Sequence, residues 1–422
     1  MTTEQSAPDP VFDTFFDDPH AKYRELHASG CPVHKVVTPQ GIPAWFVTEH
    51  EAVRQGLRDP RLSRRLENAG PGYQRAAGPT QLLAKSVVTE DPPEHTRLRR
   101  ALNQAFAPRT IKRLEPRIIA LADELVDDIA KKLAETGQAD LMSDLALPLP
   151  LIVIAEMLGV PVERRLDFQR WGDGMLALDA KVQKESGAAM IGFLGELVRA
   201  KTDNPGDDML SYWVAARDQD GNPYDAQEIL SLTTVMLVGG YDTSVGMIAG
   251  TLLGLLADRE RFADVFEDPD RLPGVLEEFL RLYGTVHTGV RRFATEDFEL
   301  AGQDIAKGDA VLLSIGAANR DPNRYPNPDE VAEERLGSRN HLAFGLGPHI
   351  CPGNELARLE IEIAVRAVLT RLPRLRLAVS TSEGAPSPHS LRHAVPYRRA
   401  YFIRVPLAVP VELDVVPEAS AS

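Results

Sequence analysis

Hydrophobic and polar positions follow two different patterns along the chain. From His34 to Thr48, β-branched and aromatic residues flank a Pro-Gln-Gly turn, which predicts two neighbouring strands. Helical patterns then dominate to about Phe266, and the clearest breaks fall at 146–154 and 203–208, where Pro, Gly and Asp gather. The C-terminal third alternates strand-like stretches with glycine-containing turns, and residues 371–413 again favour strands. The pattern therefore predicts a mainly α fold with small β-sheets.

The longest predicted helix begins near Asp225 and is apolar on nearly every side. One alternative is a membrane span, because Gly246, Gly250 and Gly254 have the spacing of a helix-dimer face. However, the polar and small residues 239–243 interrupt the apolar run near its middle, and the sequence offers no second span. We therefore expect a buried central helix and no membrane association.

Composition and charge narrow the class of protein. The 422 residues are 43% hydrophobic and 26% charged, which is typical of a packed enzyme, and the formal net charge of -14 argues against binding to nucleic acid or anionic lipid. The first thirty residues lack the basic start and apolar core of a signal peptide, so we expect a cytoplasmic protein. We expect a single domain over residues 1–422, with flexible tails at 1–8 and 414–422.

The two cysteines, Cys31 and Cys351, lie far apart in the sequence, which fits free thiols in a reducing compartment and excludes a zinc site built from cysteine pairs. Around Cys351, three glycines allow a tight loop, and a helical pattern begins directly afterwards. We expect amide groups and the helix start to lower the pKa of this thiol, which favours binding of a metal such as haem iron. The alternative for Cys351 alone is an inert buried thiol.

The segment around Cys351 resembles the ligand loop of the cytochrome P450 family, FGxGxHxCxGxxLAR, and the similarity extends from about Asp91 to Pro410. The matching residues are Phe344, Gly345, Gly347, His349, Cys351, Gly353, Leu356, Ala357 and Arg358. The resemblance implies the P450 fold and one haem b (iron protoporphyrin IX), with Cys351 as the iron ligand. It also implies that Phe344, Gly345 and Gly353 lie beside the haem.

A carboxylate and a guanidinium three residues apart, Glu278 and Arg281, resemble the ExxR pair of the same family, with Arg335 as its third member. A carboxylate that holds two guanidiniums by bidentate hydrogen bonds can fix the helix behind the ligand loop. Most pairs with this spacing are ordinary surface pairs, which is the alternative here. The position about 70 residues before the cysteine loop supports the family interpretation.

Haem carries two propionates, which need cationic or hydrogen-bonding partners when they are buried. His95, Arg99, Arg292 and His349 are similar to the propionate contacts of the family. Any one of them alone would more often be a solvated surface charge, so the prediction depends on the set.

Asp242 and Thr243 occupy the place of the family's acid and alcohol motif in the long helix. The resemblance implies that they relay protons to dioxygen bound at the haem. The alternative is a threonine whose hydroxyl caps a carbonyl of its own helix beside a solvated aspartate.

The sequence departs from the family pattern at three positions. Tyr241 and Gly239 replace residues that are usual in the long helix, and Thr285 replaces a proline after the ExxR segment, which puts the path of the following stretch in doubt. By the same alignment the substrate pocket is lined by Val87, Val88, Val238, Gly239, Val286, Thr288 and Leu407.

The resemblance implies a monooxygenase that transfers one atom of O2 to a small organic molecule such as a secondary metabolite. The aromatic content of 6% and the largely aliphatic set of lining candidates favour an apolar substrate. Electrons would come from NAD(P)H through a ferredoxin and its reductase or a flavodoxin-type donor, which could dock on the basic segment 95–117 near the cysteine face. A solvated basic helix face is the alternative for that segment. A P450 that performs oxidative coupling or uses peroxide, and a non-enzymatic haem sensor or carrier, remain the alternatives for the whole protein.

Overall fold

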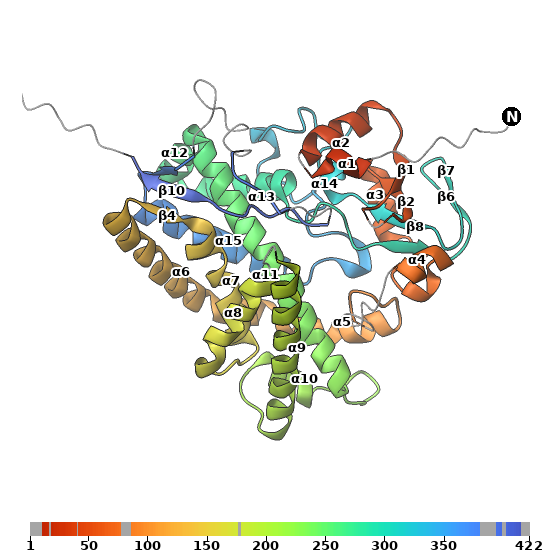
Figure 1. Cartoon of the computed structure of the whole chain (residues 1–422), viewed down its shortest axis with the longest axis horizontal. Helices are drawn as coiled ribbons and strands as arrows, with labels where there is room; N and C mark the ends of the chain where they lie inside the picture. The colour runs from red at the N-terminus through yellow and green to blue at the C-terminus, as the bar shows by residue number, and fades with distance from the viewer. Residues whose placement is uncertain are drawn as a thin grey trace, which may run out of the picture.

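Helices carry most of the chain in the computed structural model (Figure 1), which describes residues 11–16, 18–39, 41–76, 86–175, 179–379, 394–398 and 402–414. The α-helices are α1 (Val11–Phe15), α2 (Pro19–Ala28), α3 (His50–Arg58), α4 (Pro71–Ala76), α5 (Glu94–Ala105), α6 (Pro108–Thr136), α7 (Pro148–Met157), α8 (Arg165–Met175), α9 (Ala180–Asp203), α10 (Met209–Ala215), α11 (Ala226–Ala257), α12 (Arg259–Glu267), α13 (Leu272–Tyr283), α14 (Ile315–Ala318) and α15 (Asn354–Arg371). Short 3-10 turns are η1 (Leu66–Asn68), η4 (Val162–Arg164), η5 (Pro269–Arg271), η6 (Glu333–Arg335) and η7 (Gly347–His349), and η3 (Met142–Ala146) is a π-turn.

The strands form three small sheets. They are β1 (Val33–Val37), β2 (Pro43–Val47), β3 (Leu62–Ser63), β4 (Gln138–Asp140), β5 (Arg292–Ala294), β6 (Phe298–Leu300), β7 (Gln303–Ile305), β8 (Ala310–Leu313), β9 (Leu375–Leu377) and β10 (Pro410–Leu413). The largest sheet has the order β1-β2-β8-β5-β3, and the others are β4-β10-β9 and β6-β7. The antiparallel pair β1 and β2 confirms the two predicted strands, with Val33 opposite Val47.

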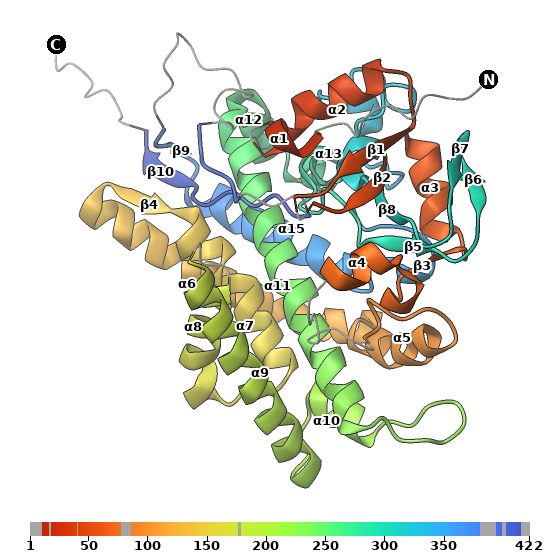
Figure 2. The ribbon, with the colours of Figure 1, turned by 45° about the vertical axis from the view of Figure 1, so that its right-hand side comes forward.

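The long helix α11 crosses the middle of the molecule (Figures 1 and 2), with α6–α9 on one side and the β1–β2 sheet with α1–α3 on the other. Asp225 caps its start in a reciprocal capping box with Glu228. The helix ends at Ala257, because the Asp258 side chain accepts a hydrogen bond from the Arg261 amide and caps the start of α12.

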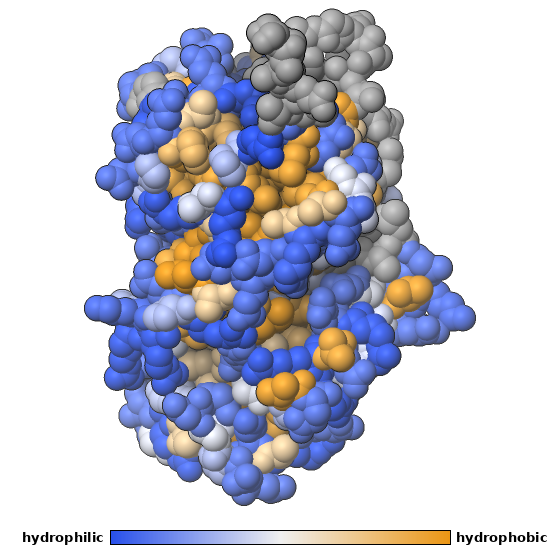
Figure 3. Space-filling model, turned by 90° about the vertical axis from the view of Figure 1, so that its left-hand side faces the viewer, coloured by the Kyte–Doolittle hydropathy of each residue, from blue (hydrophilic) through white to orange (hydrophobic). Residues whose placement is uncertain are grey.

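The burial of α11 argues against the alternative of a membrane span. Although α11 is long and apolar enough to span a membrane, 72% of its most apolar window is buried inside the protein. The glycine face serves internal packing, since a Cβ at Gly246 would lie 2.7 Å from Thr285 Cγ2. On the face in Figure 3 the surface is largely hydrophilic with separate apolar patches. We conclude that α11 is a core helix.

Of the two predicted breaks, 203–208 is confirmed, because it separates α9 from α10. The break at 146–154 is wrong, since most of this segment belongs to the buried helix α7. Pro148 is the first residue of α7, where its missing N–H is not needed, so a proline-containing apolar segment can still be a helix.

Of the two predicted tails, only Asp414 belongs to the described residues. Asp414, the first residue of the predicted C-terminal tail, pairs with Arg376 at 3.2 Å and Arg259 at 3.3 Å, so the ordered chain includes it. The rest of both tails lies outside the described residues.

Candidate functional site

The loop around Cys351 is tight. The Cys351 amide donates to the Phe344 carbonyl at 2.9 Å, and Gly345 and Gly347 adopt left-handed backbone angles (φ +70° and +78°) that disfavour other residues. A Cβ at Gly347 would lie 2.9 Å from the Leu57 carbonyl oxygen, so only glycine allows the loop to contact α3 this closely. The glycines predicted from the sequence therefore shape the loop that presents the thiol.

The thiol of Cys351 does not have the lowered pKa that the sequence predicts. Burial raises its pKa and outweighs the hydrogen bond from the Gly353 amide and the charges of Arg99 and Arg358, which lower it. The expectation was wrong because α15 begins only at Asn354 and the sulfur is removed from water. An ionised sulfur at this place needs a further positive charge, such as a metal ion.

Cationic and imidazole side chains gather on the same side of the loop. The rings of His95 on α5 and His349 on η7 have centroids 4.1 Å apart. The charges of Arg64, Arg99 and Arg292 act on one or both of these rings. The structure thus brings together all four residues predicted to contact haem propionates.

The lowered pKa values and unpartnered nitrogens of this cluster are typical of an anion-binding site. Burial lowers the pKa of His95 to about 4 and of Arg292 to about 10, and the neighbouring Arg99 and Arg64 lower the pKa of His95 further. Both ring nitrogens of His95 and the Nε atoms of Arg64 and Arg292 are buried without a hydrogen-bond partner among the described residues. Buried donors of this kind are costly, and an anion would satisfy them.

The sequence interpretation missed Arg64. This residue follows β3 and is held by the Asp91 carboxylate, which accepts from the Arg64 amide at 3.1 Å. Its hydrogen-bond partners Val88 and Asp91 lie 24 and 27 residues along the chain, so no local pattern around Arg64 reveals the cluster.

The acid and the alcohol in α11 have separate partners. Thr243 donates its hydroxyl to the Gly239 carbonyl at 2.6 Å, which is the helix-capping alternative considered above. Asp242 accepts from Arg398 at 3.2 Å and is part-buried rather than solvated, so the other half of that alternative is wrong. Burial raises the pKa of Asp242, and Arg398 opposes the shift.

Thr285, which replaces the usual proline, makes two hydrogen bonds. Its hydroxyl donates to the Thr243 carbonyl at 3.0 Å, and its own carbonyl accepts from the Arg404 amide at 2.8 Å. Of the other departures, Tyr241 donates to Asp173 at 3.0 Å, and a Cβ at Gly239 would meet nothing within 4 Å. Gly239 therefore faces open space in the middle of a mostly buried helix.

The predicted pocket residues differ in exposure. Val238 and Gly239 are exposed in the middle of α11, whereas Thr288 is fully buried and its hydroxyl has no partner among the described residues. Val87 is also buried, and it belongs to the main apolar core. The remaining members are half-buried, namely Val88, Val286 and Leu407.

The predicted ExxR contacts are present. Arg281 donates to both carboxylate oxygens of Glu278, at 2.8 and 2.9 Å, and Arg335 donates to the same carboxylate at 3.2 Å. Glu278 and Arg281 are buried, at 3% and 2% exposure, so this is not an ordinary surface pair.

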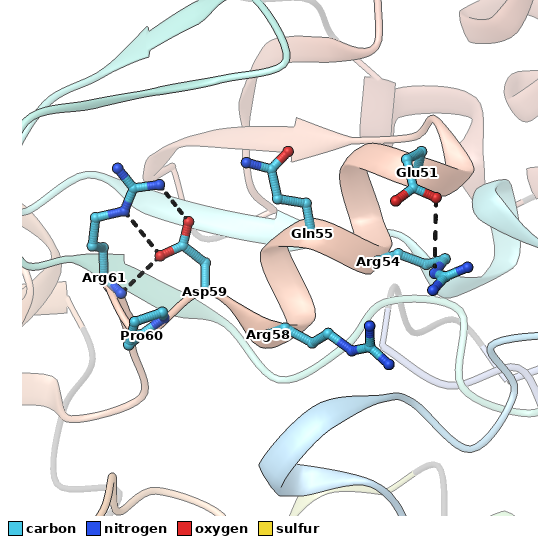
Figure 4. Close-up of a pocket in the computed structure, with 7 residues that line it drawn as sticks. All are labelled: Glu51, Arg54, Gln55, Arg58, Asp59, Pro60 and Arg61. Atoms are coloured by element: carbon cyan, nitrogen blue, oxygen red, sulfur yellow. Dashed lines mark hydrogen bonds and ion pairs between the residues drawn. The ribbon is translucent and has the colours of Figure 1, made fainter.

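Much of the basic segment 95–117 is neutralised within the chain. Arg97 pairs with Asp218 and Glu228, and Arg117 pairs with Glu156 at 3.1 Å. A surface depression of about 510 Å³ over α3 (Figure 4) carries further arginines. In it, Arg58 has no ion-pair partner among the described residues, and its Cγ would lie 3.2 Å from a Cβ at Gly347.

Comparisons with known proteins agree with this arrangement. The family profile of Cytochrome P450 matches residues 12–374. Cytochrome P450 monooxygenase PikC of Streptomyces venezuelae is 39% identical over 370 residues, which is 87% of each chain, and 6-deoxyerythronolide B hydroxylase of Saccharopolyspora erythraea is 35% identical over 98% of this chain and 100% of its own. The solved structure of PksS from Bacillus subtilis 168 covers 97% of this chain and 100% of its own, with a TM-score of 0.85 and 30% identity. The chain therefore belongs to the cytochrome P450 family of haem-thiolate monooxygenases.

Proposed function

We propose that Cys351 is the iron ligand of one haem b and that the cluster beside it holds the propionates. The observation that supports this proposal is a half-buried free thiol in a glycine-shaped loop. Beside it, both ring nitrogens of His95 and the Nε atoms of Arg64 and Arg292 are buried without a hydrogen-bond partner among the described residues. These residues fit haem b, because its iron supplies the positive charge that the thiol needs and its two carboxylates supply the missing acceptors. The propionate set is His95, Arg99, Arg292 and His349 together with Arg64, within a single domain.

Haem b, when bound, supplies the activation of O2 and the transfer of one oxygen atom to the substrate, with electrons that originate from NAD(P)H. Asp242 and Thr243 deliver protons in this reaction. The Thr243 hydroxyl can rotate from the Gly239 carbonyl toward the open space beside it, where it can donate a proton. Asp242 can take up a proton from solvent on its second carboxylate oxygen, which has no partner among the described residues, and pass it to Thr243. Burial raises the pKa of Asp242 and so favours this protonated form.

The substrate in this proposal is a small, apolar organic molecule such as a secondary metabolite. Val238 and Gly239 are exposed in the middle of α11, and a Cβ at Gly239 would meet nothing within 4 Å. In this proposal Val87, Val88, Val286, Thr288 and Leu407 complete the apolar lining. Relatives include a Mycinamicin IV hydroxylase/epoxidase and 6-deoxyerythronolide B hydroxylase, which supports this chemical class.

The electron donors in this proposal are a ferredoxin with its reductase, or a flavodoxin-type protein, in the cytoplasm. Arg58 lies against the cysteine loop, and Arg109 and Lys112 are exposed at the start of α6. None of these three has an ion-pair partner among the described residues, so they are the basic residues that we propose for docking, in place of the whole segment 95–117. An acidic electron carrier fits these residues, and no membrane or nucleic acid is required.

Two measurements test the proposal. The first is the difference spectrum of the reduced protein with and without carbon monoxide, where the red-shifted Soret band of a thiolate-ligated haem is expected and its absence would refute Cys351 as the ligand. The second is the ratio of product to O2 consumed in Thr243→Ala, which we expect to fall because the proton donor is lost. Thr234→Ala is the matched control, since Thr234 donates to the Leu230 carbonyl of the same helix at 2.8 Å.

The same measurements separate the alternatives. A haem carrier would bind ligands with unchanged affinity in Thr243→Ala and would form no product from O2. A peroxide-dependent enzyme would form product with peroxide at the unchanged rate, whereas the proposed relay requires that the Thr243 variant lose yield per O2 with NAD(P)H.

A further inference from the structure

Helix α13 carries two adjacent glutamates that bind different parts of the protein. Glu278 holds Arg281 and Arg335, as described above. Glu277 is 5% exposed, and it accepts from Arg358 Nε at 2.6 Å and Nη2 at 3.2 Å and from His341 Nε2 at 2.9 Å. Successive residues of a helix point about 100° apart, so the second carboxylate reaches a different neighbour.

The two hydrogen-bond partners of Glu277 lie on the two sides of the cysteine loop, and exposed Arg339 is a further ion-pair partner at 3.7 Å. His341 Nδ1 accepts from the Ala343 amide at 3.2 Å, so Nε2 carries the hydrogen and donates it to Glu277. Arg358 lies on α15, after the loop, and its guanidinium stacks over the Phe344 ring at 4.6 Å. One buried carboxylate therefore fastens the segment before the loop and the helix after it.

A chain of hydrogen bonds continues from Arg358 to the cysteine itself. Arg358 Nη1 donates to the Asn354 side-chain oxygen at 2.8 Å, and Asn354 Nδ2 donates to the Cys351 carbonyl at 3.0 Å. The Phe344 carbonyl, below the stacked guanidinium, accepts from the Cys351 amide. Both backbone polar groups of Cys351 are thus oriented by contacts that lead back to Arg358.

Glu277 carries the negative charge in this chain of hydrogen bonds. Hydrogen bonds from His341 and Arg358 outweigh burial and lower the pKa of Glu277 to about 2, so it is a full anion at neutral pH. The positive charge of Arg358 is one of those that act on the Cys351 sulfur. The Glu277 anion compensates that positive charge.

We infer that Glu277 is a positioning residue of the thiolate loop, which fixes Cys351 through Arg358 and Asn354 and controls how strongly the Arg358 charge acts on the sulfur. The inference rests on the proposed role of Cys351 as the iron ligand. Groups that orient a ligand or donate to it tune the potential of the metal they surround. Glu277 would therefore help to set the reduction potential of the bound haem.

The test is a potentiometric titration of the haem-loaded Glu277→Gln variant. We expect the reduction potential to shift in the positive direction, because the uncompensated Arg358 charge stabilises the reduced, more negative state. Glu355→Gln is the matched control, since the Glu355 carboxylate lies 3.4 Å from the same guanidinium. The Glu355 side chain is 52% exposed, so water screens its charge. Its shift should be several times smaller.

Two further variants keep the result interpretable. Arg358→Gln should shift the potential in the negative direction, and the double variant Glu277→Gln/Arg358→Gln should return toward the wild-type value. If Glu277→Gln does not retain haem, the Arg358→Gln shift alone decides. An unchanged potential in Glu277→Gln or in Arg358→Gln, or shifts equal to that of Glu355→Gln, would overturn the inference. A wild-type protein without the thiolate band in its carbon monoxide spectrum would instead refute the ligand assignment.

Discussion

Glu360 on α15 allows a quantitative test of how burial controls charge in this protein. Its side chain is 2% exposed and forms a hydrogen bond with Ser244 of α11. Burial raises the pKa of Glu360 to about 8, so the carboxyl is protonated at neutral pH in the folded state. We predict that Glu360→Gln, which keeps the shape and a hydrogen-bonding group, removes a large part of the pH dependence of stability.

The sign and magnitude follow from proton linkage. In the unfolded chain the Glu360 carboxyl has its ordinary pKa of 4.5, whereas the folded protein holds the proton until about pH 8. The stabilisation from this group is therefore fully present below pH 4.5 and is lost as the pH rises to the folded value. At about 1.4 kcal/mol for each pH unit of the window, the loss approaches ~5 kcal/mol as an upper limit.

The assay is chemical unfolding of the haem-loaded protein at several values between about pH 5 and 9, followed by circular dichroism. The wild type should lose a few kcal/mol more than Glu360→Gln over this range, so that the variant is the more stable protein at the alkaline end. Glu362→Gln is the control, because Glu362 lies on the same helix but is paired with Arg366 at the surface. Parallel pH profiles for the wild type and Glu360→Gln would refute the assignment of a buried neutral carboxyl.

Three other variants test single contacts. Arg64→Gln should accelerate the transfer of haem to apomyoglobin by about tenfold, because a charge-assisted contact to a propionate is lost, and an unchanged rate would remove Arg64 from the proposed site. Glu278→Gln should lower the free energy of unfolding by about 3–5 kcal/mol, since Arg281 becomes a buried uncompensated charge, and denaturant unfolding measures it. Gly246→Ala should cost about 1–3 kcal/mol in the same assay, because its Cβ would lie 2.7 Å from Thr285 Cγ2, and full stability would show that this packing relaxes freely.

Local sequence patterns predicted the elements whose determinants lie close together in the chain. The capped start of α11 at Asp225 depends on Glu228, three residues away, and the loop at Cys351 depends on nearby glycines with φ values near +70° and +80°. The contacts of Glu278 with Arg281 and Arg335 were predictable from the family resemblance and not from spacing, because most pairs three residues apart in a helix lie on the surface.

Other features could not be predicted because they depend on long-range packing. The apolar segment of α7 contains two prolines, and only the surrounding core shows that they are tolerated in its first turn. The net pKa of Cys351 depends on burial, which a loop sequence does not reveal. Arg64 and Arg398 reach the site from segments that are remote in sequence from its other members, so nothing in their own neighbourhood distinguishes them from surface arginines.

Thr285, which stands where the family has a proline, links α11 to the wall of the proposed pocket. A proline has no hydroxyl, whereas Thr285 donates to the Thr243 carbonyl and so fixes the start of the segment that carries Val286 and Thr288. The Thr285 carbonyl accepts from the Arg404 amide, which belongs to the C-terminal segment. Arg398 of the same segment pairs with Asp242. The proposed proton-delivery pair and the proposed lining residues are therefore connected by hydrogen bonds through Thr285 and the C-terminal segment.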